Sequence, residues 1–186
     1  GMFRQPPFAK WELRGIPVVV LVGSALHFAF DWCGHWRPLA IIAAVNESVW
    51  EHLKLAFWPS LLWALIGYVI FKPNAWAFWS AKGYALPVAP ILIIIIFYSY
   101  TALLGRNFLI LDIATFILAI AAGQLVSAKL MAAKSLDSRA CIIGVGLLLC
   151  QIAAYSTLTF YPPPFALFKD DRNGIRGIPP ATTFQH

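Results

Sequence analysis

Long runs of apolar residues constrain this sequence more than any other feature. Runs at about 15–33, 55–71, 85–104 and 140–160 approach the roughly 20 residues that an α-helix needs to cross a bilayer. A fifth run, from Asn107 to Ala128, is apolar except for Asp112 near its start and Gln124 near its end. Because 60% of the residues are hydrophobic and only 12% are charged, the sequence predicts an all-α integral membrane protein with five transmembrane helices.

The predicted organisation is a single transmembrane helical domain over residues 15–160, between an N-terminal tail, 1–14, and an irregular proline-rich C-terminal tail, 161–186. Between the first two spans, the segment PLAIIAAV is apolar but too short to cross a bilayer. It predicts a re-entrant or interfacial half-helix at residues 38–46.

The start of the second helix carries a local signal. Ser48, with Glu51 three residues later, has the form of a capping box, so we expect the helix to begin there. After this helix we expect a loop at 72–74 that extends through Trp76, Trp79 and Lys82.

Threading five helices alternately through a bilayer divides the charged residues between two faces. One face receives eight basic residues: Arg4, Lys10, Arg14, Lys72, Lys82, Lys129, Lys134 and Arg139. The other receives six: Arg37, Lys54, Arg106, Lys169, Arg172 and Arg176. The positive-inside rule then places the first face and the N-terminus in the cytoplasm. No nucleic-acid-binding motif accompanies the basic residues, so the expected partner is the lipid bilayer and not nucleic acid.

The second face also collects the polar residues that suggest chemistry. His27 and Asp31 are four residues apart and share one helix face, with His35 one turn further on if the helix continues. Imidazole and carboxylate groups at this spacing are typical of half a metal site, although a simple His27–Asp31 hydrogen bond is the alternative. Glu51 and Lys54 are explained by capping and an i,i+3 ion pair, whereas neither role requires Glu47 or His52.

From this pattern we select candidate site residues. The candidate metal ligands are His27, Asp31 and His52, and the ion would be zinc, iron or manganese. The candidate catalytic carboxylates are Glu47 and Glu51. Candidate pocket or supporting residues are Asn46, Ser48, Trp50, Lys54 and Asp112. Asp112 is equally explained by an ion pair with Arg106.

Several motifs carry a family resemblance. HFAFDWCG, NESVWEHLK, NFLILDIATFILAIAAGQ and PPPFALFKDD together resemble a family of small bacterial integral membrane proteins catalogued as domain of unknown function 6512. The chain departs from the family pattern at Asp31, where the family has Glu, and at Cys33, where it has Ser. The resemblance implies a multi-pass protein of the bacterial cytoplasmic membrane and implies no activity.

Two functions remain in competition at this point. One is a metal-dependent enzyme that acts on a lipid or lipid-linked substrate at one membrane face. The other is a non-enzymatic protein that binds or transports an ion, a proton or a small solute through a broken-helix gate, with a homodimer completing the path. A bis-histidine haem site formed by His27 and His52 is a more distant alternative.

Overall fold

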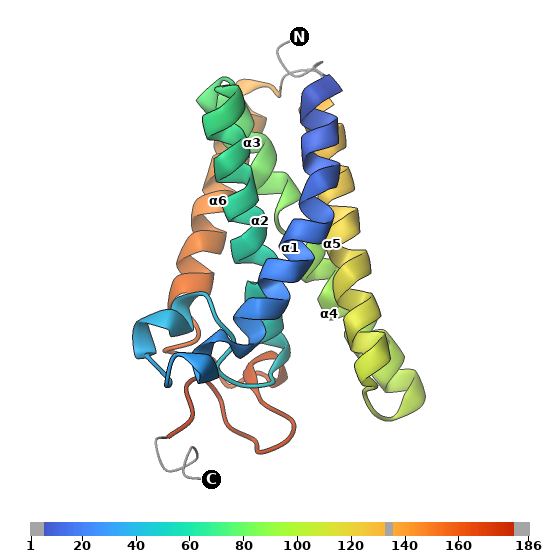
Figure 1. The fold of residues 1–186 in the computed structure, drawn as a ribbon, viewed down its shortest axis with the longest axis vertical. Helices are drawn as coiled ribbons and strands as arrows, with labels where there is room; N and C mark the ends of the chain where they lie inside the picture. Colours follow the sequence, from blue (N-terminus) through green and yellow to red (C-terminus); the bar gives the residue numbers. More distant parts are fainter. Residues whose placement is uncertain (1–5, 133–135, 181–186) are drawn as a thin grey trace.

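The computed structural model describes residues 6–132 and 136–180, which form a bundle of long helices (Figure 1). Six α-helices follow one another along the chain: α1 (Pro6–Trp32), α2 (Val49–Phe71), α3 (Ala75–Ala85), α4 (Val88–Leu104), α5 (Leu109–Ala132) and α6 (Ser138–Thr157). Two short 3-10 helices lie outside them, η1 (Arg37–Ile41) and η2 (Ala166–Phe168). Within the described ranges there is no β-strand, so the predicted all-α class is confirmed.

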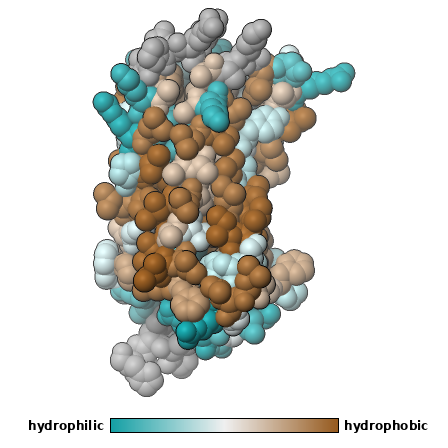
Figure 2. All heavy atoms as spheres, turned by 90° about the vertical axis from the view of Figure 1, so that its right-hand side faces the viewer, coloured by the Kyte–Doolittle hydropathy of each residue, from teal (hydrophilic) through white to brown (hydrophobic). Residues whose placement is uncertain are grey.

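Five segments are long and apolar enough to cross a membrane, as predicted: Phe8–Trp32, Val49–Phe71, Ala75–Leu104, Leu109–Ala132 and Ser138–Thr157. Figure 2 shows the corresponding surface, on which apolar side chains form a band between two hydrophilic ends. Large apolar side chains such as Leu21 and Leu118 are exposed within this band. In water such a surface would be unstable, and in a bilayer it faces lipid. The chain is therefore an integral membrane protein.

The third span consists of two helices, and here the predicted loop was wrong. Trp76, Trp79 and Lys82 belong to helix α3 instead of extending the loop at 72–74. The helix break falls later, at Leu86 and Pro87, because a proline has no N–H to continue the hydrogen-bond ladder. Helix α3 packs closely on α6, and the backbones approach so closely at Gly83 and Gly144 that neither position has room for a side chain.

Lys82 is also not at the membrane surface, where the loop prediction put it. Its Nζ atom lies 2.5 Å from Oε1 of Glu12 and donates to the hydroxyl of Ser127 at 2.7 Å. Both charged side chains are almost completely buried. This ion pair joins α1, α3 and α5 inside the bundle.

The connection between α1 and α2 differs from the predicted half-helix. Only Arg37–Ile41 is helical, as a 3-10 turn, and the chain is irregular from there to Ser48. Ser48 occupies the N-cap position of α2, but its side chain makes no capping hydrogen bond. The predicted capping box does not form because Oε2 of Glu51 accepts instead from the backbone N–H of Val45, at 3.0 Å.

The C-terminal segment after α6 folds back onto this connection at the end of the bundle opposite the start of α1 (Figure 1). Phe168 is buried, and its ring lies 4.7 Å from the ring of Trp50 at the start of α2. Lys169 and Arg176 form an isolated antiparallel bridge that closes a turn between them. The C-terminal segment thus covers the region where α1 ends and α2 begins.

Candidate functional site

A buried network surrounds Glu51 and Lys54 in the first two turns of α2. Lys54 Nζ lies 2.7 Å from Glu51 Oε2 and donates to the carbonyls of Ala40 and Ala43 at 2.7 and 3.0 Å. It donates as well to the hydroxyl of Thr159, which in turn donates to Glu51 Oε1, both at 2.8 Å. The predicted Glu51–Lys54 pair is therefore present, and it ties the connection before α2 to the chain after α6.

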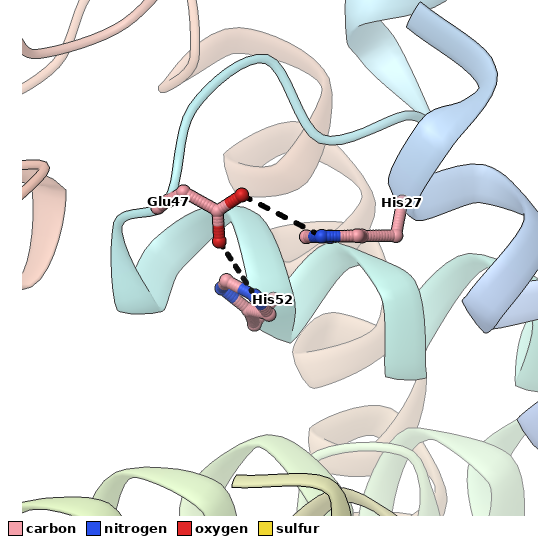
Figure 3. Close-up of side chains that lie close together, drawn as sticks. All are labelled: His27, Glu47 and His52. Atoms are coloured by element: carbon pink, nitrogen blue, oxygen red, sulfur yellow. Dashed lines mark ion pairs between the residues drawn. The ribbon is translucent and has the colours of Figure 1, made fainter. Parts of the chain in front are cut away.

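Four residues before Glu51, the side chain of Glu47 meets two histidines (Figure 3). Oε1 of Glu47 lies 3.5 Å from Nε2 of His27 in α1, and Oε2 lies 3.6 Å from Nε2 of His52 in α2. One donor atom from each of the three residues lies within 4.8 Å of the other two. Over the described residues this is the only group of three or more His, Cys, Asp or Glu side chains that meets this geometry.

The orientation of His52 is fixed by its other ring nitrogen. Nδ1 lies 2.9 Å from the carbonyl oxygen of Ser48. A carbonyl only accepts, so Nδ1 carries a proton and Nε2 is the nitrogen that faces Glu47. If Nε2 is unprotonated, its lone pair faces a carboxylate, which is repulsive unless a cation lies between them. The arrangement therefore suits a site for a metal ion or a proton.

The His27, Glu47 and His52 side chains are 24%, 30% and 35% exposed. This is intermediate between a structural ion pair and a free surface group. Each of the three side chains is thus partly accessible from outside the protein.

The C-terminal segment holds the backbone on both sides of Glu47. Buried Asp170 accepts the backbone N–H of Glu47 at 3.1 Å through Oδ2. The amide of Asn46 donates to the carbonyl of Gly177 at 2.8 Å, and its oxygen accepts the N–H of Ser48 at 2.8 Å. The sequence analysis gave Asp170 no role, and the only signal for it was its place in the motif PPPFALFKDD.

Arg172 also approaches the three-residue group. Its Nη1 atom lies 3.6 Å from Oε1 of Glu47, and its backbone N–H donates to Asp170 Oδ1 at 2.8 Å. The side chain is 73% exposed. Asp170 therefore anchors both Glu47 and the arginine that faces it.

Two predicted site residues lie away from this group. Asp31 pairs with His35 at 3.0 Å and is exposed. Helix α1 ends at Trp32, and Gly34 and His35 both adopt left-handed backbone conformations. Asp31 thus contacts the turn that follows α1. Glu47 lies beside His27, where the sequence analysis expected Asp31.

Asp112 belongs to a different part of the same molecular end. Its carboxylate accepts hydrogen bonds from the hydroxyl of Tyr100 and, at 3.1 Å, from the amide of Asn107. Neither the expected pairing with Arg106 nor a contact with the histidines is present.

Trp50, another predicted pocket residue, packs its ring 4.8 Å from that of Tyr155, in the interior of the bundle.

Comparison with known proteins identifies the family to which the chain belongs. A family model described as "Family of unknown function (DUF6512)" matches residues 2–178, so the chain belongs to this family. No curated protein and no solved structure matches the chain.

Proposed function

We propose that this DUF6512 protein binds a divalent metal ion through His27, Glu47 and His52 and uses it to activate water against a lipid or lipid-linked substrate. The observation that carries the proposal is the spacing of the donor atoms. Ligand atoms of a tetrahedral zinc site, bound at about 2.0–2.1 Å, lie roughly 3.3 Å apart. The two histidines lie 3.5 and 3.6 Å from the two different oxygens of Glu47, and one donor atom from each of the three residues lies within 4.8 Å of the other two, so a small movement would bring them to this spacing.

The donor set also suits catalysis better than a purely structural role. Two histidines and one carboxylate are a common ligand set of catalytic zinc, which keeps its remaining position for water. Iron and manganese accept the same donor types. Asp31 and Glu51 are not needed in this arrangement, and Glu47 acts as a ligand instead of as a general base.

The chemistry that such a centre supports is ester hydrolysis. A metal ion held by His27, Glu47 and His52 would act as a Lewis acid and would make a water molecule nucleophilic near neutral pH. In ester hydrolysis water adds to the carbonyl carbon or phosphorus atom, the bond to the leaving oxygen breaks with its electron pair, and the proton lost by the water reaches that oxygen through solvent. No other reactant is required.

The position of the centre indicates which substrates can reach it. His27 lies five residues before the end of α1, where Trp32 and Trp36 are exposed as membrane-interface aromatics often are. An ester at the level of the lipid headgroups lies at this depth. A lipid or lipid-linked substrate therefore fits the site better than a small solute from the bulk phase.

The proposed orientation puts the N-terminus in the cytoplasm of a bacterial cell and the metal centre on the outer side of its cytoplasmic membrane. Lys82 and Lys54 are buried, so neither contributes to the surface charge of its face. Removing one from each set leaves seven basic residues on the face of the N-terminus and five on the other. The remaining excess still favours a cytoplasmic N-terminus.

The test is elemental analysis of protein purified in detergent without chelators. Near-stoichiometric zinc, iron or manganese is expected in the wild type and in the control Asp31→Ala, and its loss is expected in His27→Ala. Equal metal in His27→Ala and the wild type would overturn the site. Absence of metal from the wild type would favour the competing function, in which a proton shared by Glu47 and the histidines serves solute binding or transport.

A second measurement tests the reaction. Metal-loaded protein is incubated with bacterial phospholipids in mixed micelles, and the products are followed by mass spectrometry. We expect hydrolysis that stops when a chelator is added and returns when zinc is added. We expect no hydrolysis by Glu47→Gln. Hydrolysis that persists in Glu47→Gln would contradict the mechanism.

A further inference from the structure

A second polar feature lies next to the metal centre and is not part of it. A cavity of about 290 Å³ lies between η1 and the C-terminal segment. Arg37, at the start of η1, lines one side, and Arg176 lines another. Its volume is at the lower end of the range for small-molecule sites and suits a small headgroup or a single phosphate.

The charge of the cavity selects anions. Neither Arg37 nor Arg176 forms an ion pair with a carboxylate in residues 6–132 and 136–180, and no acidic residue lines the cavity. Each guanidinium group presents several N–H donors in a planar fork that matches the oxygens of a phosphate. Among the described residues, these two groups give the cavity a positive charge that no carboxylate offsets.

The cavity has a fixed frame, unlike a chance gap between mobile surface loops. Gly177 has a φ angle of 69°, and a Cβ atom there would lie 2.6 Å from the carbonyl oxygen of Thr159. Only glycine fits this close crossing without strain. The carbonyl of Gly177 is held by Asn46, and the hydroxyl of Thr159 belongs to the Glu51–Lys54 network. The two parts of the C-terminal segment that line the cavity, at Thr159 and at Gly177, are therefore both held by hydrogen bonds.

The surroundings favour a lipid as the source of the anion. Thr159 and Phe160 directly follow the membrane-spanning helix α6, so the cavity lies at the membrane face. Phe160, Ile178 and Pro179 add apolar lining beside the two arginines. A mainly polar cavity that has two arginines and a smaller apolar part at the membrane face matches a phosphate attached to a glycerol backbone.

We propose that the cavity between η1 and the C-terminal segment binds the phosphate group of an anionic membrane lipid through Arg37 and Arg176. The proposal does not depend on the metal centre. It assigns to the C-terminal segment a lipid-binding role in addition to its contacts with Glu47.

The experiment uses the full chain in a neutral detergent with short-chain phosphatidylglycerol as the probe, and short-chain phosphatidylcholine and inorganic phosphate as comparison ligands. Saturable binding of phosphatidylglycerol is expected. Arg37→Gln and Arg176→Gln should each weaken it about tenfold, because each removes charge-assisted hydrogen bonds. The double variant should bind phosphatidylglycerol no better than phosphatidylcholine.

Arg106→Gln is the matched control, because this exposed arginine lies at the α4–α5 turn, where it stacks over Phe108. It removes the same charge and should leave binding unchanged. Equal losses in Arg106→Gln and the cavity variants would overturn the proposal in favour of general charge attraction. Inorganic phosphate that binds as tightly as the lipid would overturn the lipid assignment.

The metal content of the cavity variants separates this proposal from the proposed function. Arg37→Gln and Arg176→Gln should retain the metal of the wild type and its melting temperature, since both side chains are exposed. If lipid binding is lost while metal is retained, the cavity is a separate site. If lipid binding is unaffected by either change, the cavity does not bind lipid, whatever the result at the metal centre.

Discussion

Glu47 and Glu51 are four residues apart, yet their surroundings are opposite. Every partner of Glu51 lies at 2.7–3.0 Å, and the side chain is 1% exposed. Glu47 faces His27, His52 and Arg172 at 3.5–3.6 Å, outside hydrogen-bonding distance, and is 30% exposed. The first carboxylate has a complete set of short hydrogen bonds, whereas the second has only three longer ion pairs.

The difference separates a structural charge from a candidate ligand. A buried carboxylate with all its hydrogen bonds made has no capacity left for another partner, and it rigidifies what it touches. A half-exposed carboxylate between two imidazoles retains that capacity. The network around Glu51 fixes the connection before α2, and this connection carries Glu47.

The largest expected effect is a loss of stability when the network around Glu51 is broken. Lys54→Ala leaves the carboxylate of Glu51 buried without its cation, which should reduce the free energy of unfolding by about 3–5 kcal/mol. Thermal unfolding in detergent is the measurement. Glu47→Ala, made in parallel, should cost no more than about 1 kcal/mol, because its ion pairs are long and partly exposed. Equal losses of stability would remove the distinction between the two glutamates.

The next largest effect is a loss of metal binding when Glu47 is changed. Glu47→Gln should abolish stoichiometric metal binding while the protein stays folded, because a neutral amide is a poor ligand for zinc. Glu51→Gln should lower stability but keep metal in the folded fraction. Elemental analysis of the monodisperse fraction after size exclusion distinguishes these outcomes. Metal retained by Glu47→Gln and lost from Glu51→Gln would reverse the assignment.

A smaller effect is expected from the group that positions Glu47. Asp170→Asn replaces one acceptor oxygen by an NH₂ group, so it cannot accept from both Glu47 and Arg172. Metal affinity should fall roughly 10- to 100-fold, as for other residues that orient a ligand. Competition with a fluorescent zinc chelator measures the change. Asp171→Asn, which changes the neighbouring exposed carboxylate, is the control and should leave the metal affinity unchanged.

The smallest expected effect has the opposite sign. Arg172 competes with a metal ion for Glu47, so Arg172→Gln should raise the metal affinity by up to about fivefold, the equivalent of one weak surface ion pair. The same chelator competition detects it. The gain should shrink at high salt, because exposed charges are screened. A loss of affinity would mean that Arg172 supports the centre instead of opposing it.

Features encoded by neighbouring residues could be predicted from the sequence. The five spans follow from local apolar runs. His27 and His52 were selected as metal ligands and Glu47 as a catalytic carboxylate, because polar groups are rare in such a sequence and neither capping nor i,i+3 pairing required Glu47 or His52. The start of the third span was missed because the run 75–85 contains Lys82, whose cost of burial is offset by a partner in another helix, Glu12.

Other features depend on contacts that no local pattern reveals. The group around Glu47 and Glu51 contacts Thr159, Asp170 and Gly177, which lie 108 to 131 residues away from their partners in the sequence. The predicted capping box does not form because Glu51 accepts from the nearby N–H of Val45 and from the distant hydroxyl of Thr159 instead of from Ser48. Helical spacing favoured Asp31 as the neighbour of His27, but the end of α1 turned it toward His35.

The contact between the C-terminal segment and the connection before α2 also determines when, during synthesis, the backbone around Glu47 is held in place. The ribosome delivers His27, Glu47 and His52 first, but the residues that hold the backbone around Glu47 emerge only after the fifth span. A nascent chain that stalls before residue 170 lacks Asp170 and cannot fix Glu47 in place. If His27, Glu47 and His52 bind a metal ion as proposed, the ion would be captured late in biogenesis, after the fifth span has been made.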